Sequence, residues 1–447
     1  MTKIALPEDV KFIIDVITRA GYEAYAVGGC IRDTLLNREP EDWDIATSAA
    51  PWKVKELFHH TIDTGLKHGT VTVMMHRVGY EVTTYRIDGE YLDGRHPESV
   101  SFVTSLEEDL KRRDFTINAM AYNDRSGLVD LFGGQRDMEQ GMIRCVGNAA
   151  DRFREDALRM LRALRFSAQL GYQIHPFTQD AISKMAVNLR KVSAERIQTE
   201  FLKLLLSPHP EYLQRMYELG LTAQFLPEFD RMMETEQNNP HHCYTVGIHT
   251  IRVMQGAPSD RVLRLAALFH DVGKPDCKWT DGDGTDHFAG HAQEGCNMTE
   301  QIMRRLKFDN DTIRQVCCLV LYHDMGNDAE ITPEFTRYLM HDVGPELFSK
   351  LLTLKEADVA AQSAYMQEEK AENHRRMRLY YEEALRKAYC IDLKHLALKG
   401  RDLMEAGMRP GTQMGEALER LLNEVLSHPE RNQKDILLEK LRAWGYI

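Results

Sequence analysis

The periodicity of apolar residues changes at about residue 150, and this change limits what the chain can fold into. Before it, short runs of β-branched and aromatic residues at 25–27, 43–45, 69–75 and 80–85 alternate with helical segments at 5–20 and 30–36. After it, apolar residues recur every three or four positions and strand signals almost vanish. The pattern predicts an α+β N-terminal domain with a small mixed sheet and helices, followed by an all-α body and tail.

Helical periodicity beyond residue 150 divides into segments separated by Pro, Gly and Asn. The predicted helices are 152–170, 176–188, 193–206, 210–219, 245–256, 260–270, 289–307, 310–323, 333–341, 345–388 and 413–443. Clusters near 208–210 and 238–240 are candidate boundaries. We expect four parts, covering 1–150, 151–238, 239–370 and 371–447.

Length, charge and cysteine content narrow the class of protein. A chain of 447 residues is longer than one hydrophobic core usually accommodates, so several domains are expected. The sequence contains no run of about 18 apolar residues, which is the length needed to span a membrane. The net charge of −12 argues against indiscriminate nucleic-acid binding, but residues 111–165 hold 11 Lys and Arg against 8 Asp and Glu. Eight cysteines without a CxxC pair, and no apolar signal core at the N-terminus, predict a reduced, cytoplasmic protein.

Two aspartates carry the first candidate chemistry. Residues i and i+2 of a strand point to the same face, so Asp42 and Asp44 would present their carboxylates side by side. A divalent cation relieves the repulsion between them, and oxygen ligands suit Mg²⁺. Two such ions can activate an attacking hydroxyl and stabilise a leaving pyrophosphate. Taken alone, two aspartates at this spacing are more often part of a polar turn than a metal site. Glu81, on a later strand, is either a third catalytic carboxylate or an exposed side chain.

A pair of glycines upstream favours the catalytic interpretation. Gly28 and Gly29 follow the predicted strand 25–27 and lead into the helix that carries Arg32. Bare glycine amides at a helix N-terminus form a nest that binds phosphate. A nest followed closely by a carboxylate pair is much less common than either feature alone, so the sequence predicts a nucleotide site.

Four segments in this order resemble the motifs of class II tRNA nucleotidyltransferases, a family within the polymerase β superfamily. They read GGCIRD from residue 28 with DWDIAT from 42, RRDFTINAM from 112, EDALRMLRALRF from 155, and SAERI from 193 with a glutamate at 200. The resemblance covers roughly residues 20–205. It implies an enzyme that adds CCA to the 3′ end of tRNA from CTP and ATP without a nucleic-acid template. It implies a nucleotidyltransferase head at 1–150, a helical neck with the nucleotide-selecting helix at 151–238, and a tail at 371–447 that contacts tRNA.

The resemblance also implies roles for individual residues. Arg113, Arg162 and Arg165 would contact the nucleotide, including its triphosphate, and Asp114 would hold the ribose hydroxyls. The full set of predicted nucleotide-binding residues is Gly28, Gly29, Arg32, Arg113, Asp114, Asp156, Arg159, Arg162 and Arg165.

Asp156 and Arg159 suit the selection of C and A. They lie three positions apart, about 60° around a predicted helix, so they would share a face. Cytosine and adenine each present an amino donor beside a ring acceptor, which a carboxylate and a guanidinium match. Uracil and guanine reverse this polarity and would lose charged hydrogen bonds of about 1.5–3 kcal/mol each. On an anonymous helix the pair would more simply be a surface salt bridge.

A second metal site is predicted in the helical body. His270 and Asp271, in the segment LFHDVGKP, form a His-Asp pair that can ligate one metal ion, although an isolated pair is more often a helix end. Further candidates follow the order of an HD-type phosphohydrolase module, which 239–370 resembles: His249, His291, His323 and Asp358. Imidazole-rich sets suit Mn, Ni, Fe, Co or Zn. The resemblance implies hydrolysis of phosphomonoester or 2′,3′-cyclic phosphate ends, with Lys274 meeting phosphate. His241, His242 and His287 are predicted to be surface residues.

Three alternatives remain open at this level. The first is a poly(A) polymerase, which shares the head but usually has a basic tail and no HD module. The second is a specialist that adds only A or only CC. The third is an HD phosphohydrolase with a vestigial head.

Residues 86–97 resemble the loop that such enzymes need to switch from C to A addition, and CC-adding relatives tend to lack it. We therefore expect a tRNA transcript that ends in CC to gain one adenosine from ATP. The product would be measured on a sequencing gel, and a transcript that gains nothing while CC addition proceeds would contradict the expectation.

Overall fold

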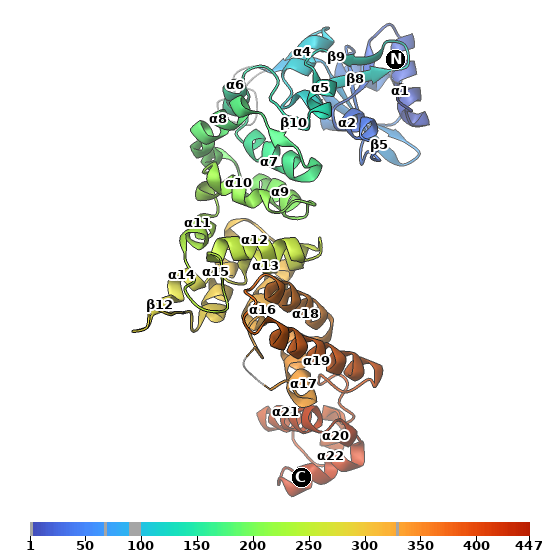
Figure 1. Cartoon of the computed structure of the whole chain (residues 1–447). Coiled ribbons are helices and arrows are strands. Elements are labelled where there is room, and N and C mark those ends of the chain that lie inside the picture. Colours follow the sequence, from blue (N-terminus) through green and yellow to red (C-terminus); the bar gives the residue numbers. More distant parts are fainter. Residues whose placement is uncertain (1–2, 67–68, 89–99, 328–329) are drawn as a thin grey trace. The chain divides into compact units, whose positions relative to one another are not determined.

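The computed structural model describes residues 3–66, 69–88, 100–327 and 330–447, which form two compact units, 1–227 and 228–447. The predicted α+β domain and the helical body are confirmed (Figure 1). The four-part division stays a prediction. The predicted switching loop at 86–97 lies outside the described residues except at its start, 86–88.

A seven-stranded mixed sheet forms the centre of the first unit. Its order is β3-β4-β5-β2-β1-β8-β9, and only β2 and β5 run parallel. The strands are β1 (Ala24–Val27), β2 (Asp44–Thr47), β3 (Thr61–Gly65), β4 (Thr70–Met75), β5 (Val78–Thr84), β8 (Met120–Asn123) and β9 (Gly127–Asp130). The four strands predicted from the sequence are confirmed as β1, β2, β4 and β5, whereas β3, β8 and β9 were not predicted.

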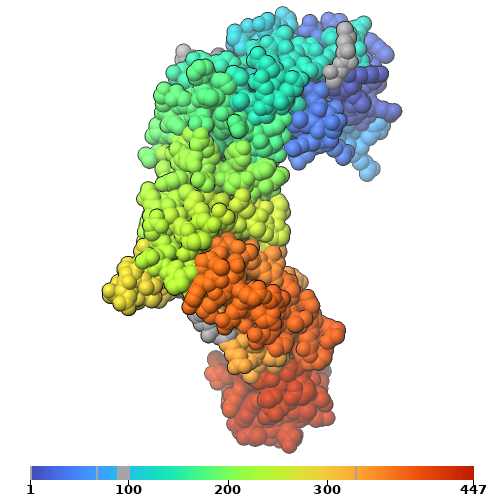
Figure 2. Space-filling model, in the orientation of Figure 1, coloured from blue at the N-terminus to red at the C-terminus, as the bar shows by residue number. Residues whose placement is uncertain are grey.

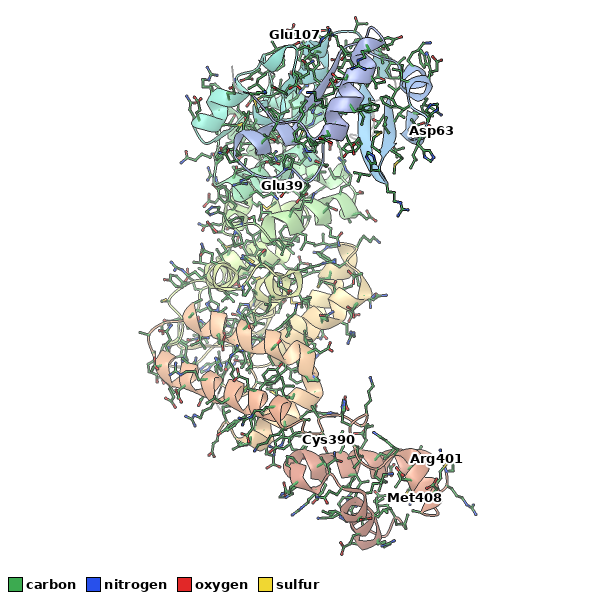
Figure 3. The ribbon with its side chains drawn as sticks, turned by 90° about the vertical axis from the view of Figure 1, so that its right-hand side faces the viewer. Glu39, Asp63, Glu107, Cys390, Arg401 and Met408 are labelled. Atoms are coloured by element: carbon green, nitrogen blue, oxygen red, sulfur yellow. The ribbon has the colours of Figure 1, made fainter. Side chains whose placement is uncertain are left out.

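The central strands are buried on both faces, which explains their nearly continuous apolar sequence. Ala24 and Ala26 of β1 pack against α1 (Glu8–Arg19), α2 (Gly29–Leu35) and α3 (Pro51–Leu57). Tyr25 and Val27 point to the opposite face and pack with Leu110 of α4 (Leu106–Lys111). This two-sided burial holds the ends of β1 and β2 rigidly. At the sheet edge, Asp63 of β3 is exposed and pairs with Lys55 at 2.9 Å (Figure 3).

Helices and short elements complete the first unit. They are β6 (Arg86–Asp88), β7 (Val100–Phe102), α5 (Gly134–Glu139), β10 (Met142–Ile143), α6 (Ala149–Glu155), α7 (Leu158–Leu170), β11 (Gln173–Ile174), α8 (Pro176–Met185), α9 (Ala194–Leu205) and α10 (Tyr212–Glu218). The prediction of one helix at 152–170 is wrong, because the chain extends at Asp156 with φ of −148° and separates α6 from α7.

The second unit is helical apart from one short hairpin. Its helices are α11 (Pro227–Glu234), α12 (Val246–Gly256), α13 (Arg261–Phe269), α14 (Lys274–Cys277), α15 (His291–Arg305), α16 (Asn310–Tyr322), α17 (Pro333–Val343), α18 (Pro345–Ala360), α19 (Gln367–Arg386), α20 (Gly400–Glu405), α21 (Thr412–Ser427) and α22 (Lys434–Ala443). Figure 2 shows the hairpin of β12 (Trp279–Thr280) and β13 (Asp286–His287) standing out from the surface of this unit.

Two long helices predicted for the second unit are each divided. The predicted helix 345–388 is α18 and α19, and 413–443 is α21 and α22. Apolar residues recur at helical spacing on both sides of each break, so periodicity alone did not show where one helix ends and the next begins. Near the C-terminus, Arg401 projects from α20 into solvent, with 86% of its side chain exposed (Figure 3).

Candidate functional site

Three carboxylates meet at the start of β2. Asp44 is the first residue of β2, and the parallel register that pairs Ile45 with Val82 brings Glu81 of β5 beside it. Burial of Asp44 and the charge of Asp42 raise the pKa of Asp44 to about 6; Arg113 acts in the opposite direction and Glu81 adds to the rise. Asp42 and Glu81 are exposed. Like charges gathered in this way favour binding of a divalent cation, so the donor set fits the predicted Mg²⁺.

Gly28 lies where β1 turns into α2. Its φ of +85° favours glycine, and a Cβ there would lie 2.8 Å from Nη1 of Arg113. Its N–H donates to the carbonyl of Met120 at 3.1 Å, so the prediction of a bare amide is wrong for this residue. The glycine is required by its backbone conformation and by the close approach of Arg113. Gly29 is the first residue of α2.

Arg32 and Arg113 are held by buried polar partners. Nη1 of Arg32 donates to Oδ1 of Asn118 at 2.6 Å, and its other nitrogens bind Asp33 at 2.7 and 2.9 Å. Nη2 of Arg113 lies 3.4 Å from the carboxylate of Asp109, which is fully buried. Both guanidinium groups are therefore oriented before any ligand arrives.

Asp114 is a buried carboxylate that connects the head to α7. One oxygen accepts from the backbone N–H of Phe115 at 2.8 Å and from Asn118 at 3.1 Å. The other accepts from Nε and Nη2 of Arg162 at 2.8 and 2.7 Å. All four acceptor positions are filled, so a contact with ribose hydroxyls requires one of these bonds to be exchanged.

The arginines of α7 share one buried acid and one aromatic ring. Glu200 of α9 binds Arg165 at 2.5 Å and Arg162 at 3.6 Å. The ring of Phe166 has the Cζ atoms of Arg165, Arg32 and Arg162 at 3.8, 4.8 and 5.3 Å from its centroid. Positive charge is thus concentrated here, stabilised by cation–π contacts.

Asp156 and Arg159 do not share one helix, contrary to the prediction. Asp156 lies at the junction of α6 and α7, where Arg196 of α9 binds both its oxygens at 2.7 and 3.3 Å. Arg159 lies on α7 and pairs with Glu155, while its Nη2 donates to the carbonyl of Arg112 at 3.0 Å. The two residues predicted to read the base are therefore held by separate partners.

Four residues of this network had no predicted role. They are Asn118, Phe166, Arg196 and Glu200. All four lie inside the motif segments, which was the signal available. Each also has a partner that is distant in the sequence, such as Arg32 for Asn118 and Asp156 for Arg196, so spacing alone could not assign them.

The six residues predicted for the second metal site converge in the second unit. They form two groups whose ligand atoms lie within 4.8 Å of one another: His249, His270 and Asp358, and Asp271, His291 and His323. The carboxylate of Asp271 lies 3.3 Å from Nε2 of His270 in the first group and 3.6 Å from Nε2 of His291 and His323. The structure thus contains two neighbouring groups of metal-ligating atoms, with the carboxylate of Asp271 close to both, where the sequence predicted one metal site.

The imidazole rings are oriented for metal binding. The Nδ1 atoms of His270, His291 and His323 lie 2.7–2.9 Å from backbone carbonyls, which only accept hydrogen bonds, and Nδ1 of His249 lies 3.4 Å from one. A ring that donates through Nδ1 to a carbonyl has its Nε2 lone pair available for a metal ion. Nε2 of His249 lies 3.4 Å from Nε2 of His270, and Nε2 of His291 lies 3.3 Å from Nε2 of His323, so these atoms gather in pairs that a cation could join. The donor set fits a transition metal.

A cavity of about 490 Å³ opens onto these ligands. Lys274 and Lys370 line it, and Nζ of Lys274 lies 2.8 Å from Asp271. His241, His242 and His287 also line it and are half-buried, so the prediction that these three are surface residues outside the site is wrong. Nε2 of His242 lies 3.4 Å from Nζ of Lys274. The cavity therefore combines metal-ligating groups with cationic side chains.

The Asp114 network makes a prediction about stability. Burial acts to raise the pKa of Asp114, but Arg162, Asn118 and Arg159 lower it to about 2. A carboxyl whose pKa is lower in the folded state stabilises the fold above about pH 4, and this contribution is lost as the pH falls through 2. We expect Asp114→Asn to lose about 2 kcal/mol of unfolding free energy at pH 6 and little at pH 2.

Urea unfolding of both proteins followed by circular dichroism would measure this difference. A difference between wild type and Asp114→Asn that stays constant from pH 6 to pH 2 would contradict the assignment of the shift to this carboxyl.

Among the described residues, every helix is too short or too polar to span a lipid bilayer.

Known proteins match this chain along nearly its whole length. Family models match at 24–144 (poly A polymerase head domain), 171–233 (RNA and SrmB-binding site of polymerase A) and 293–441 (tRNA nucleotidyltransferase domain 2). The CCA-adding enzyme of Lactiplantibacillus plantarum is 36% identical over 438 residues, 97% of this chain and 95% of that protein. The crystal structure of Bacillus stearothermophilus CCA-adding enzyme in complex with CTP is 31% identical, with a TM-score of 0.72 and 97% of each chain covered. The chain belongs to the family of CCA-adding enzymes, which are nucleotidyltransferases.

Proposed function

We propose that this protein adds CCA to the 3′ end of tRNA from CTP and ATP, without a nucleic-acid template. The observation that carries the proposal is the gathering of Asp42, Asp44 and Glu81 at the start of β2, beside Arg113. Relatives that carry the name CCA-adding enzyme support it, as does the complex of one of them with CTP.

The side chains around the start of β2 would have different roles in nucleotidyl transfer. Asp42 and Asp44 would hold Mg²⁺, with Glu81 as a further carboxylate. Two such ions would supply activation of the 3′-hydroxyl of the RNA and charge stabilisation for the leaving pyrophosphate. Arg113 and Arg162 would orient the triphosphate. Arg113 adjoins the turn at Gly28, where a side chain would clash with its guanidinium group. Arg32 and Arg165 were predicted to contact the nucleotide, but both are largely buried, so we assign them instead to holding Phe166 in place.

Asp156 and Arg159 would select the base. A carboxylate that accepts from the amino group and a guanidinium that donates to the ring nitrogen match cytosine and adenine alike. Asp114 remains the candidate for the ribose hydroxyls after exchange of one of its four hydrogen bonds. We assign residues 1–150 to the catalytic head, 151–238 to the neck, 239–370 to a phosphohydrolase domain and 371–447 to a tail that contacts tRNA.

Replacing the paired aspartates tests the head. We expect Asp42→Asn and Asp44→Asn each to lower the incorporation of CTP into a tRNA transcript lacking CCA by about a thousandfold, because charge stabilisation of several kcal/mol is lost. Asp63→Asn, an exposed aspartate on β3 of the same sheet, is the matched control and should retain activity.

The same assay, run with each nucleotide separately and together, distinguishes the alternatives. Full addition gives one CCA end, a specialist stops at CC or requires it, and a poly(A) polymerase extends with ATP alone. If both aspartate variants retain the wild-type rate, the proposed role of this site is wrong.

We further propose that the second unit is a metal-dependent phosphohydrolase acting on phosphomonoester or 2′,3′-cyclic phosphate ends of RNA. The convergence of four Nε2 atoms with Asp271 and Asp358 carries this proposal. One or two transition-metal ions would supply a nucleophilic water at neutral pH. Lys274 and Lys370, which line the cavity, would bind the phosphate, and Gln362 would orient Asp358, to which its amide donates at 3.1 and 3.2 Å.

Loss of one ligand tests the metal centre. We expect Asp271→Asn to lower both the content of Mn²⁺ or Ni²⁺ after dialysis and the hydrolysis of 2′,3′-cyclic AMP by about a hundredfold. CCA addition should be unchanged. Asp311→Asn, an exposed aspartate on α16, is the matched control. Absent hydrolysis by the wild type, or equal metal content in the two proteins, counts against the proposal.

A further inference from the structure

Arg196 of α9 holds the carboxylate predicted to read the base. Its Nη2 donates to Oδ2 of Asp156 at 2.7 Å and its Nη1 to Oδ1 at 3.3 Å. The side chains are 22% and 16% exposed, so the pair is only partly screened by water. A two-pronged contact of this kind fixes the plane of a carboxylate as well as its charge.

The remaining acceptor capacity of Asp156 is limited. Oδ1 also accepts from the backbone N–H of Leu158 at 3.0 Å, at the start of α7. Three of the four lone-pair positions of the carboxylate are therefore occupied. The position that remains is on Oδ2.

We propose that Arg196 is a specificity-determining positioning residue, which makes Asp156 a fixed acceptor with one vacant lone pair for the amino group of cytosine or adenine. This inference rests on the proposed base-selecting role of Asp156. Both oxygens of Asp156 accept hydrogen bonds from N–H groups of the protein. The carboxylate therefore offers the ligand an acceptor and no hydrogen to donate. A uracil O4 or a guanine O6 would then meet an acceptor that has no hydrogen to donate.

Arg159 is positioned by a separate set of contacts. Nη1 is occupied by Glu155 and by the carbonyl of Arg152 at 3.2 Å, while Nη2 donates to the carbonyl of Arg112. The donor and the acceptor are thus each held in place by the protein. The selectivity of Asp156 therefore depends on Arg196, which does not itself need to touch the nucleotide.

The structure predicts that the preference for CTP over UTP falls when the contact between Arg196 and Asp156 is removed. A carboxylate without Arg196 can rotate, and it can then accept a hydrogen bond from N3–H of uracil. We expect Arg196→Met, which keeps the length of the side chain, to lower the ratio of kcat/KM for CTP over UTP by about tenfold, the effect of one charged hydrogen bond. Arg196→Lys, which keeps the charge but not the two-pronged contact, should give an intermediate ratio.

The ratio for CTP over UTP is measured with a tRNA transcript lacking CCA, using the full-length chain and saturating Mg²⁺. A merely structural role would lower the rates with CTP and UTP equally and leave the ratio unchanged, and that outcome overturns the inference. Arg19→Met, an exposed arginine on α1, is the matched control. If Arg196→Met does not fold, as judged by circular dichroism, Arg196→Lys and Arg196→Gln carry the same comparison.

Asp156→Asn distinguishes this inference from the function on which it rests. An amide can present a donor to uracil, so the ratio should fall in this variant if Asp156 reads the base. An unchanged ratio in Asp156→Asn overturns the base-selecting role itself. A lowered ratio in Asp156→Asn with an unchanged ratio in Arg196→Met overturns only the role of Arg196.

Discussion

The ion pair between Asp114 and Arg162 is the interaction on which the candidate nucleotide site depends. Burial of a carboxylate is costly unless its acceptor positions are filled, and here Arg162, Asn118 and a backbone N–H fill them. This ion pair links α7 to the segment that follows α4. Because α7 also carries Arg159, and Glu200 of α9 binds Arg165, the sheet and helices α7 and α9 present their charged groups to one region.

Each candidate metal site brings ligand groups of one kind close together, carboxylates at β2 and imidazoles in the second unit, but the two sets are held in place differently. At β2, carboxylates gather around a strand end that is held rigid by burial on both sheet faces. In the second unit, the Nδ1–H groups of His270, His291 and His323 donate to backbone carbonyls, which leaves the Nε2 atoms of these rings available to a metal ion. Oxygen donors suit a hard cation such as Mg²⁺, whereas imidazole donors suit a transition metal. The two units therefore offer chemically distinct centres.

Elements with a strong, uninterrupted pattern could be predicted from the sequence. The strands β1, β2, β4 and β5 and helices such as α12 and α13 lie close to where periodicity placed them. The breaks inside 152–170 and 345–388 could not be predicted in this way, because a helix can stop and resume without losing the spacing of its apolar residues. The first of these breaks matters most, since it places Asp156 at a junction.

The sequence by itself determined the change from mixed sheet to helices, the identity of the residues with suitable chemistry, and the family resemblance that joins them. Only the tertiary structure decided which of these residues pair: Asp156 with Arg196, Asp114 with Arg162, and six ligands in two groups around Asp271. Periodicity reports contacts between residues a few positions apart. Partners that are 40 or more positions apart, as Asp156 and Arg196 are, meet only through the packing of helices against each other, which spacing along the chain does not encode.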